Sequence, residues 1–79
     1  PNPFNPSTNI QFSLPESRSV HLSVFDVSGR KVATLFNGDR LSAGVHTATF
    51  KADHLSSGLY FYRLEAGGSI QIKKMLLIK

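Results

Sequence analysis

The sequence predicts an all-β domain, an antiparallel sandwich or a barrel, and three observations lead to that expectation. Short apolar-patterned runs alternate with turn residues at intervals of about 10 residues, which is typical of such folds. No stretch of the sequence carries apolar residues at helical spacing over two turns. The chain has 79 residues, 41% of them hydrophobic, which suffices for one small domain with a thin core.

Two strands are predicted in the first third of the chain, because apolar residues alternate there with polar ones. Pro15 ends the first of them, since proline cannot donate a ladder hydrogen bond. The alternation shifts phase at Phe25 and Val27, which predicts a β-bulge or burial of both faces near Asp26. The alternating apolar residues are Ile10, Phe12 and Leu14 in the first strand and Val20, Leu22 and Val24 in the second.

Turn residues separate the next two predicted strands. Ser28-Gly29 predicts a tight turn, after which Lys31–Phe36 forms a third strand and completes a hairpin with the second. Asn37-Gly38-Asp39 predicts another turn. A loop over Leu41–Gly44 then leads to a strand over Val45–Lys51, and a short helical turn is expected shortly after it, at residues 52–55.

The fifth predicted strand, Leu59–Glu65, is the most aromatic. Because large apolar residues lie on both of its faces, we expect it to be central in a sheet. Gly67-Gly68 predicts a two-residue hairpin into a final strand, Ser69–Lys79. In that strand we expect Ile70 and Ile72 to face inward and a bulge at Lys73-Lys74 to change the facing of the residues that follow.

The composition of the chain limits the classes of function that it can have. Nine Lys and Arg against five Asp and Glu give a net charge of +4, which permits but does not require acidic partners. There is no cysteine, so disulfides are excluded. The longest apolar run, Met75–Ile78, is far shorter than the roughly 18 residues of a membrane-spanning helix. The chain begins with Pro1 and shows no signal-peptide pattern, so we expect it to be part of a longer product.

The polar residues predict no catalytic, cofactor or metal site. His21, His46 and His54 do not have the spacing of metal ligands. His46 is expected to face the core side, with its imidazole hydrogen-bonded to the backbone. The acidic residues stand singly near turns and suit local hydrogen bonds better than a paired acid and base, Asp26 among them.

Two clusters each leave a structural and a functional interpretation open. Residues Tyr60–Arg63 could form a stacking surface for nucleic acid or sugars, but core packing is favoured, so no nucleic-acid partner is predicted. Lys73, Lys74 and Lys79 flank the apolar end of the last strand. They either block edge-to-edge aggregation or help a partner protein to recognise the strand through edge hydrogen bonds.

Five blocks, in order along the chain, carry a resemblance to a known family. Together they resemble the type A C-terminal sorting domain of the type IX secretion system, which is found on secreted proteins of Bacteroidetes and related phyla. They also overlap the Ig-like domain of flagellar hook-capping proteins, but the last block favours the sorting domain. The blocks read PNPFNPST (1–8), VFDVSGR (24–30), AGVH (43–46), SGLYFYRL (57–64) and KKMLLIK (73–79).

The resemblance implies an Ig-like antiparallel β-sandwich of about seven strands over residues 1–79. Residues 1–8 would be a proline-rich segment leading in from an upstream cargo domain. The domain would direct a cargo from the periplasm across the outer membrane, so that it is secreted or reaches the cell surface. The implied partners are translocon and shuttle proteins and a sortase-like peptidase. The implied recognition signal is Lys73, Lys74, Met75, Leu76, Leu77, Ile78 and Lys79, with Gly29, Gly44 and Gly58 as structural turn glycines.

Two other functions stay open on the sequence alone. The domain could be a structural accessory, of hook-cap type or a spacer beside a secreted hydrolase, in which the lysines only protect an edge strand. It could also be a carbohydrate-binding module that uses Phe61 and the tyrosine faces, although no aromatic platform is evident beyond what the core needs.

Overall fold

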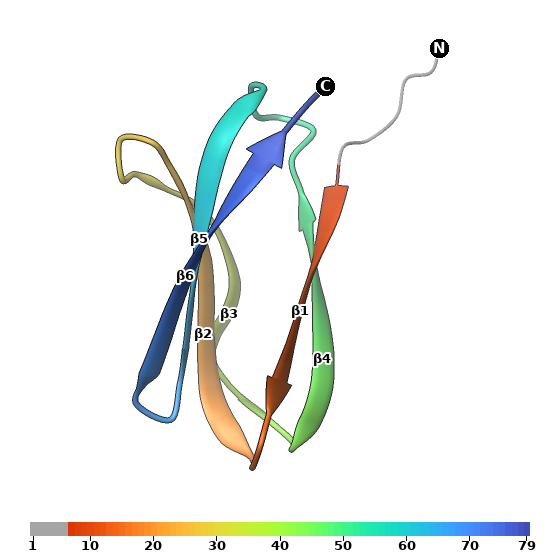
Figure 1. Ribbon diagram of the computed structural model, residues 1–79, viewed down its shortest axis with the longest axis vertical. Coiled ribbons are helices and arrows are strands. Elements are labelled where there is room, and N and C mark those ends of the chain that lie inside the picture. Colours follow the sequence, from red (N-terminus) through yellow and green to blue (C-terminus); the bar gives the residue numbers. More distant parts are fainter. Residues whose placement is uncertain (1–6) are drawn as a thin grey trace.

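The computed structural model describes residues 7–79, which form two packed antiparallel β-sheets (Figure 1). No helix occurs within these residues. Most of the predicted lead-in segment, Pro1–Pro6, lies outside the described residues, while Ser7 and Thr8 already belong to the first strand. The strands are β1 (Ser7–Leu14), β2 (Arg18–Asp26), β3 (Lys31–Leu41), β4 (Gly44–Lys51), β5 (Gly58–Ala66) and β6 (Ser69–Leu77).

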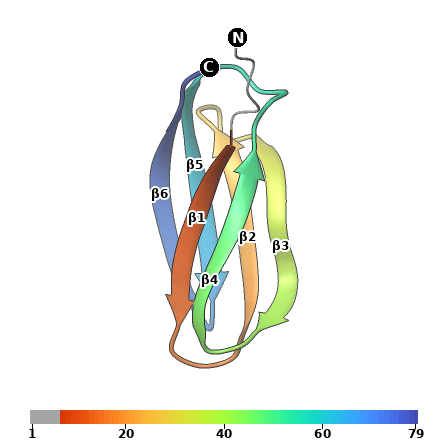
Figure 2. The same cartoon turned by 90° about the vertical axis from the view of Figure 1, so that its right-hand side faces the viewer.

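The sheets differ in size. One contains β1 and β4, and the other contains four strands in the order β3-β2-β5-β6. Figure 2 shows the small sheet lying across the large one, with β4 towards β3 and β1 towards β6. The predicted β-sandwich is confirmed, but it has six strands in residues 7–79 instead of about seven. The smaller sheet therefore leaves part of the larger sheet's inner face uncovered.

The core lies between the sheets and consists of the alternating residues that the sequence predicts. The β2 residues Val20, Leu22 and Val24 are completely buried, because β2 is an interior strand beneath the small sheet. The three apolar residues of β1 face them from the opposite sheet. The other buried core residues are Ile10, Phe12, Leu14, Ala48, Phe50, Ala52, Tyr60 and Leu64.

Strand β5 is interior in the large sheet, between β2 and β6, as predicted. Its inner residues Tyr60 and Leu64 are buried in the core. Its outer residues are not covered by another layer, and Leu59 is exposed. The large residues on both faces therefore correctly indicated a central strand, although only one face is buried against the other sheet.

The β2–β3 hairpin contains three register shifts. One lies between Val24 and Phe25 and confirms the bulge predicted near Asp26. Another lies where Val20 pairs with Asp39 and His21 pairs with Asn37, so that Gly38 is the extra residue of a bulge. The prediction of a turn at residues 37–39 was wrong, since β3 continues through them. The positive φ of Gly38 (+84°) serves a bulge within the strand.

The connections around β4 are short. Only Ser42 and Ala43 separate β3 from β4, so the predicted loop is narrower than Leu41–Gly44. After β4, the backbone N–H of Leu55 donates a hydrogen bond to the carbonyl of Ala52 at 3.0 Å. This single hydrogen-bonded turn lies where a short helical turn was predicted, at residues 52–55, but no helix forms there. It begins the loop that leads to β5.

The last strand ends at Leu77, two residues earlier than predicted, and it differs from its prediction in two further ways. Its pairing with β5 is continuous from Ala66–Ser69 to Gly58–Leu77, so there is no bulge at Lys73-Lys74. Ile70 and Ile72 face solvent on the outer face, with 53% and 64% of their surfaces exposed. Their β5 partners Glu65 and Arg63 lie on the same face. The inward-facing apolar residues of β6 are instead Met75 and Leu77, which pack against the core.

Candidate functional site

The seven residues of the predicted recognition signal lie at the end of an edge strand. Residues 73–77 belong to β6, and Ile78 and Lys79 follow it. On one side β6 pairs with β5, and within the described residues no strand pairs with its other side. The backbone N–H and C=O groups along that free edge are available to another strand.

The signal residues alternate between the two faces of β6. Met75 and Leu77 point between the sheets, where they line a cavity of about 690 Å³ with Phe50 and Tyr60. Lys73 lines a second cavity of about 400 Å³ farther along the strand. The remaining signal residues within or just after the strand, Lys74, Leu76 and Ile78, are exposed. The strand thus presents an apolar and a cationic residue on each face.

The end of the chain is held against the loop between β4 and β5. The backbone N–H of Lys79 donates to Oγ of Ser57 at 3.0 Å, and Nζ of Lys79 donates to the carbonyl of Asp53 at 2.7 Å. Asp53 and Ser57 could not be predicted as partners of the signal from the sequence, because contacts across more than 20 positions leave no local pattern. The signal is therefore presented in an ordered conformation.

A row of four residues crosses the outer face of the large sheet. Lys31 on β3 is paired with Phe25 on β2, Phe25 with Phe61 on β5, and Phe61 with Lys74 on β6. Both phenylalanines are half-buried between their neighbours. Tyr60 points to the opposite face and is buried. The aromatic residues of β5 therefore do not gather into one exposed platform.

The three predicted turn glycines all have positive φ angles. Gly29 lies in the β2–β3 turn. Gly44 and Gly58 are the first residues of β4 and β5, at the point where each loop enters its strand. The structure thus places one of the three in a tight turn and two at strand starts.

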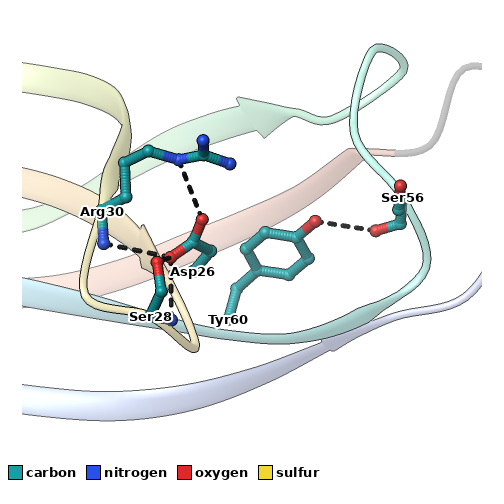
Figure 3. A network of polar contacts seen from close by, with 5 residues as sticks. All are labelled: Asp26, Ser28, Arg30, Ser56 and Tyr60. Atoms are coloured by element: carbon teal, nitrogen blue, oxygen red, sulfur yellow. Dashed lines mark hydrogen bonds and ion pairs between the residues drawn. The ribbon is translucent and has the colours of Figure 1, made fainter.

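Asp26 organises the β2–β3 turn (Figure 3). Its Oδ1 accepts hydrogen bonds from the Oγ of Ser28 at 2.6 Å, from the backbone N–H of Ser28 at 2.9 Å and from that of Arg30 at 3.0 Å. Its Oδ2 accepts a hydrogen bond from Nε of Arg30 at 3.1 Å. The Ser28 hydroxyl, followed by these N–H donors and the Arg30 charge, lowers the pKa of Asp26. The predicted local bonding of Asp26 is confirmed, and its role is structural.

In the same region, the side chain of Tyr60 on β5 is hydrogen-bonded to the loop that precedes the strand (Figure 3). Its hydroxyl donates a hydrogen bond to the carbonyl of Ser56 at 2.8 Å. A buried phenol needs such a partner, and this bond ties the β4–β5 loop to the core. The same loop holds Lys79, so the core, the loop and the end of the chain form one connected unit.

No group of three His, Asp or Glu residues within residues 7–79 could hold a metal ion. Nε2 of His46 donates to the carbonyl of Ser42 at 2.7 Å, and its ring stacks on Phe12 with centroids 5.7 Å apart, which confirms its predicted place on the core side. None of the described residues belongs to a helix that is long and apolar enough to cross a membrane.

Comparison with known proteins identifies the family. The chain matches, over residues 1–79, the family described as the secretion system C-terminal sorting domain. No curated protein and no solved structure matched the chain. The match covers every one of the five sequence blocks together with both sheets of the sandwich. The chain therefore belongs to the C-terminal sorting domains of the type IX secretion system.

Proposed function

We propose that this domain is a non-catalytic signal that directs an upstream cargo across the outer membrane, and that the machinery recognises residues Lys73–Lys79. The single observation that carries the proposal is the family match over the whole chain, residues 73–79 included. The structure supports it by placing those residues on a free sheet edge.

The chemistry of β6 suits recognition by another protein. Its free edge can form backbone hydrogen bonds with an incoming strand. Lys73 and Lys74 project to opposite faces beside that edge, so they favour partners with acidic groups and disfavour pairing with a second β6. Exposed Leu76 and Ile78 add apolar surface that has no partner within residues 7–79.

The proposal implies an order of events and a location. The cargo would reach the periplasm by an ordinary signal peptide, and translocon or shuttle proteins would then bind the sorting domain. A sortase-like peptidase would remove the domain and release the cargo or join it to the cell surface. Hydrolase or adhesin activity, if any, would belong to the upstream cargo.

The direct test changes the end of β6 in a native type IX host. We expect removal of residues 75–79 to leave the cargo in the periplasm. Because Met75 and Leu77 also pack against the core, a second variant, Leu76→Asp with Ile78→Asp, changes only exposed side chains. Periplasmic retention of a folded double variant supports recognition of this strand. Normal export of both variants contradicts the proposal and favours a structural accessory role.

A further inference from the structure

The two cavities described above lie between β1 and β6. On this side of the sandwich the large sheet extends beyond the small one (Figure 2). The larger cavity is lined by Ser7 and Thr8 at the start of β1 and by residues 74–78 on the other side. The smaller is lined by residues 11–14 of β1 and by the first half of β6. The two cavities therefore lie at the two ends of β1, and together they are called the β1–β6 groove.

One wall of the groove is a strand edge. β1 pairs with β4 over all eight of its residues, and on its other side no strand pairs with it in the described part of the chain. Eight residues of strand present a free edge about 27 Å long, at about 3.4 Å per residue. Such an edge is a template for an added strand, which would extend the small sheet over the uncovered inner face of β6.

The two ends of the groove differ in chemistry. At the larger cavity, the side chains beneath an added strand would be apolar or aromatic: Met75, Leu77, Phe50 and Tyr60. At the smaller cavity, the charged side chains in the lining are Arg18 and Lys73, and both are cationic; the lining also contains the phenol of Tyr62. Nη2 of Arg18 also forms an ion pair with the carboxylate of Glu16 at 3.0 Å, but that ion pair is exposed and contributes little to the stability of the fold. The inward-facing side chains are thus apolar or aromatic at one end and cationic at the other, and Lys74 of the outer face also lines the apolar end.

We propose that the β1–β6 groove binds one extended peptide segment of a partner protein, added as a strand to the free edge of β1. Its inward side chains would be apolar over Met75 and Leu77 and acidic over Lys73 and Arg18. An edge strand of a second copy does not supply the two acidic residues, because β1, β4 and β6 contain none and β3 contains only Asp39. The groove shares Lys73, Met75 and Leu77 with the proposed recognition signal, but peptide binding at the edge of β1 is measured on the isolated chain, without the sorting machinery.

A titration of the isotope-labelled 79-residue chain with a designed peptide tests the proposal. The peptide TETETVTI alternates threonine with two acidic and then two apolar inward residues, and its reversal ITVTETET covers the opposite chain direction. Peptides in which lysine replaces glutamate serve as charge controls. We expect the acidic peptide of one direction to shift the amide resonances of Ser7–Leu14 at concentrations below about 1 mM. Its lysine counterpart should bind at least about tenfold more weakly.

Charge reversal supplies the matched variants. Lys73→Glu should make the affinities for the acidic and the lysine peptide equal, or reverse the preference between them. Lys31→Glu makes the same change of charge at an exposed position of β3 outside the groove, and should keep the preference for the acidic peptide. No binding of either acidic peptide up to about 1 mM overturns the proposal. Resonance shifts confined to the outer face of the large sheet would also overturn it. Equal effects of Lys73→Glu and Lys31→Glu on the preference between the peptides would do the same.

Discussion

Asp26 shows how one carboxylate shapes a turn. Its four hydrogen bonds, one of which is also the ion pair with Arg30, hold the connection between β2 and β3. The short spacing to Ser28 and Arg30 made this bonding predictable from sequence, because aspartate commonly bonds backbone groups two residues farther on. By contrast, the bonds of Lys79 to Asp53 and Ser57 depend on the tertiary fold.

Replacing Asp26 with asparagine should destabilise the fold in a pH-dependent way. The folded-state pKa is lowered, so the ionised carboxylate stabilises the fold above its unfolded-state pKa, and this contribution is lost as the pH falls. We expect Asp26→Asn to lower the urea midpoint at pH 7, with the difference from wild type shrinking between about pH 5 and pH 2. Asp39→Asn, in the exposed part of the same hairpin, is the control. A difference that is constant with pH contradicts this assignment.

The Tyr60 hydroxyl should contribute measurably to stability. Tyr60→Phe removes its bond to the Ser56 carbonyl, and we expect a loss of about 1 kcal/mol in the free energy of unfolding. Tyr62→Phe makes the same change two residues farther on the same strand face, where the hydroxyl has no hydrogen-bond partner among residues 7–79. Chemical denaturation compares the two. Equal losses would mean that the Tyr60–Ser56 bond is not what stabilises this corner.

At the level of whole strands, the local sequence patterns predicted the positions of the strands well. They predicted less well which face of each strand is covered by the other sheet. The alternation in β1 and β2 identified the core correctly, because both strands lie where the two sheets overlap. The same alternation in β6 was misinterpreted. Since the small sheet does not extend over the start of β6, Ile70 and Ile72 lie on the outer face and Lys73 on the inner one. Sequence periodicity indicates two faces but not which of them another sheet covers.

The structural role of Gly38, in a turn or in a bulge, likewise depends on whether the strand continues through it. It was predicted to be in a turn because Asn-Gly is a turn signal, but the pairing of β2 and β3 continues past it. Gly38→Ala should cost about 1 kcal/mol, because its φ of +84° disfavours a side chain. Gly29→Ala, at φ +87° with open space around it, is the matched control. Thermal unfolding should show similar losses of stability for the two variants, since the added methyl at position 38 meets the movable His21 ring at 3.4 Å and the Oγ of Ser19 at 3.9 Å. A loss several-fold larger for Gly38→Ala would mean that the bulge is rigid.

The whole molecule depends on a small core. Leu22 is fully buried in an interior strand, whereas Leu76 leaves 69% of its surface exposed. We expect Leu22→Ala to lower the free energy of unfolding by about 2–5 kcal/mol, a large part of the total for a domain of this size. Leu76→Ala should change it by less than about 0.5 kcal/mol. A large loss for Leu76→Ala would show that this residue packs against something in the folded chain, contrary to its exposure.

The sandwich and most strand positions could be predicted from the sequence, because turn residues and alternation are local properties. The sheet order could not, since the pairing of β1 with β4 and of β2 with β5 joins segments distant along the chain. For the same reason the sequence could not show that β1 and β6 border an open groove. The signal residues were found through family resemblance, and their free edge was established by the topology.

The central claim is that this domain is sufficient for type IX sorting. The most direct measurement places the 79-residue chain behind a signal peptide and a fluorescent reporter, in a bacterium with the type IX machinery and in a mutant without it. The account predicts reporter outside the cells of the first strain only, with the reporter held in the periplasm of the mutant. Reporter retained in the periplasm of both strains, with the domain folded, would contradict it.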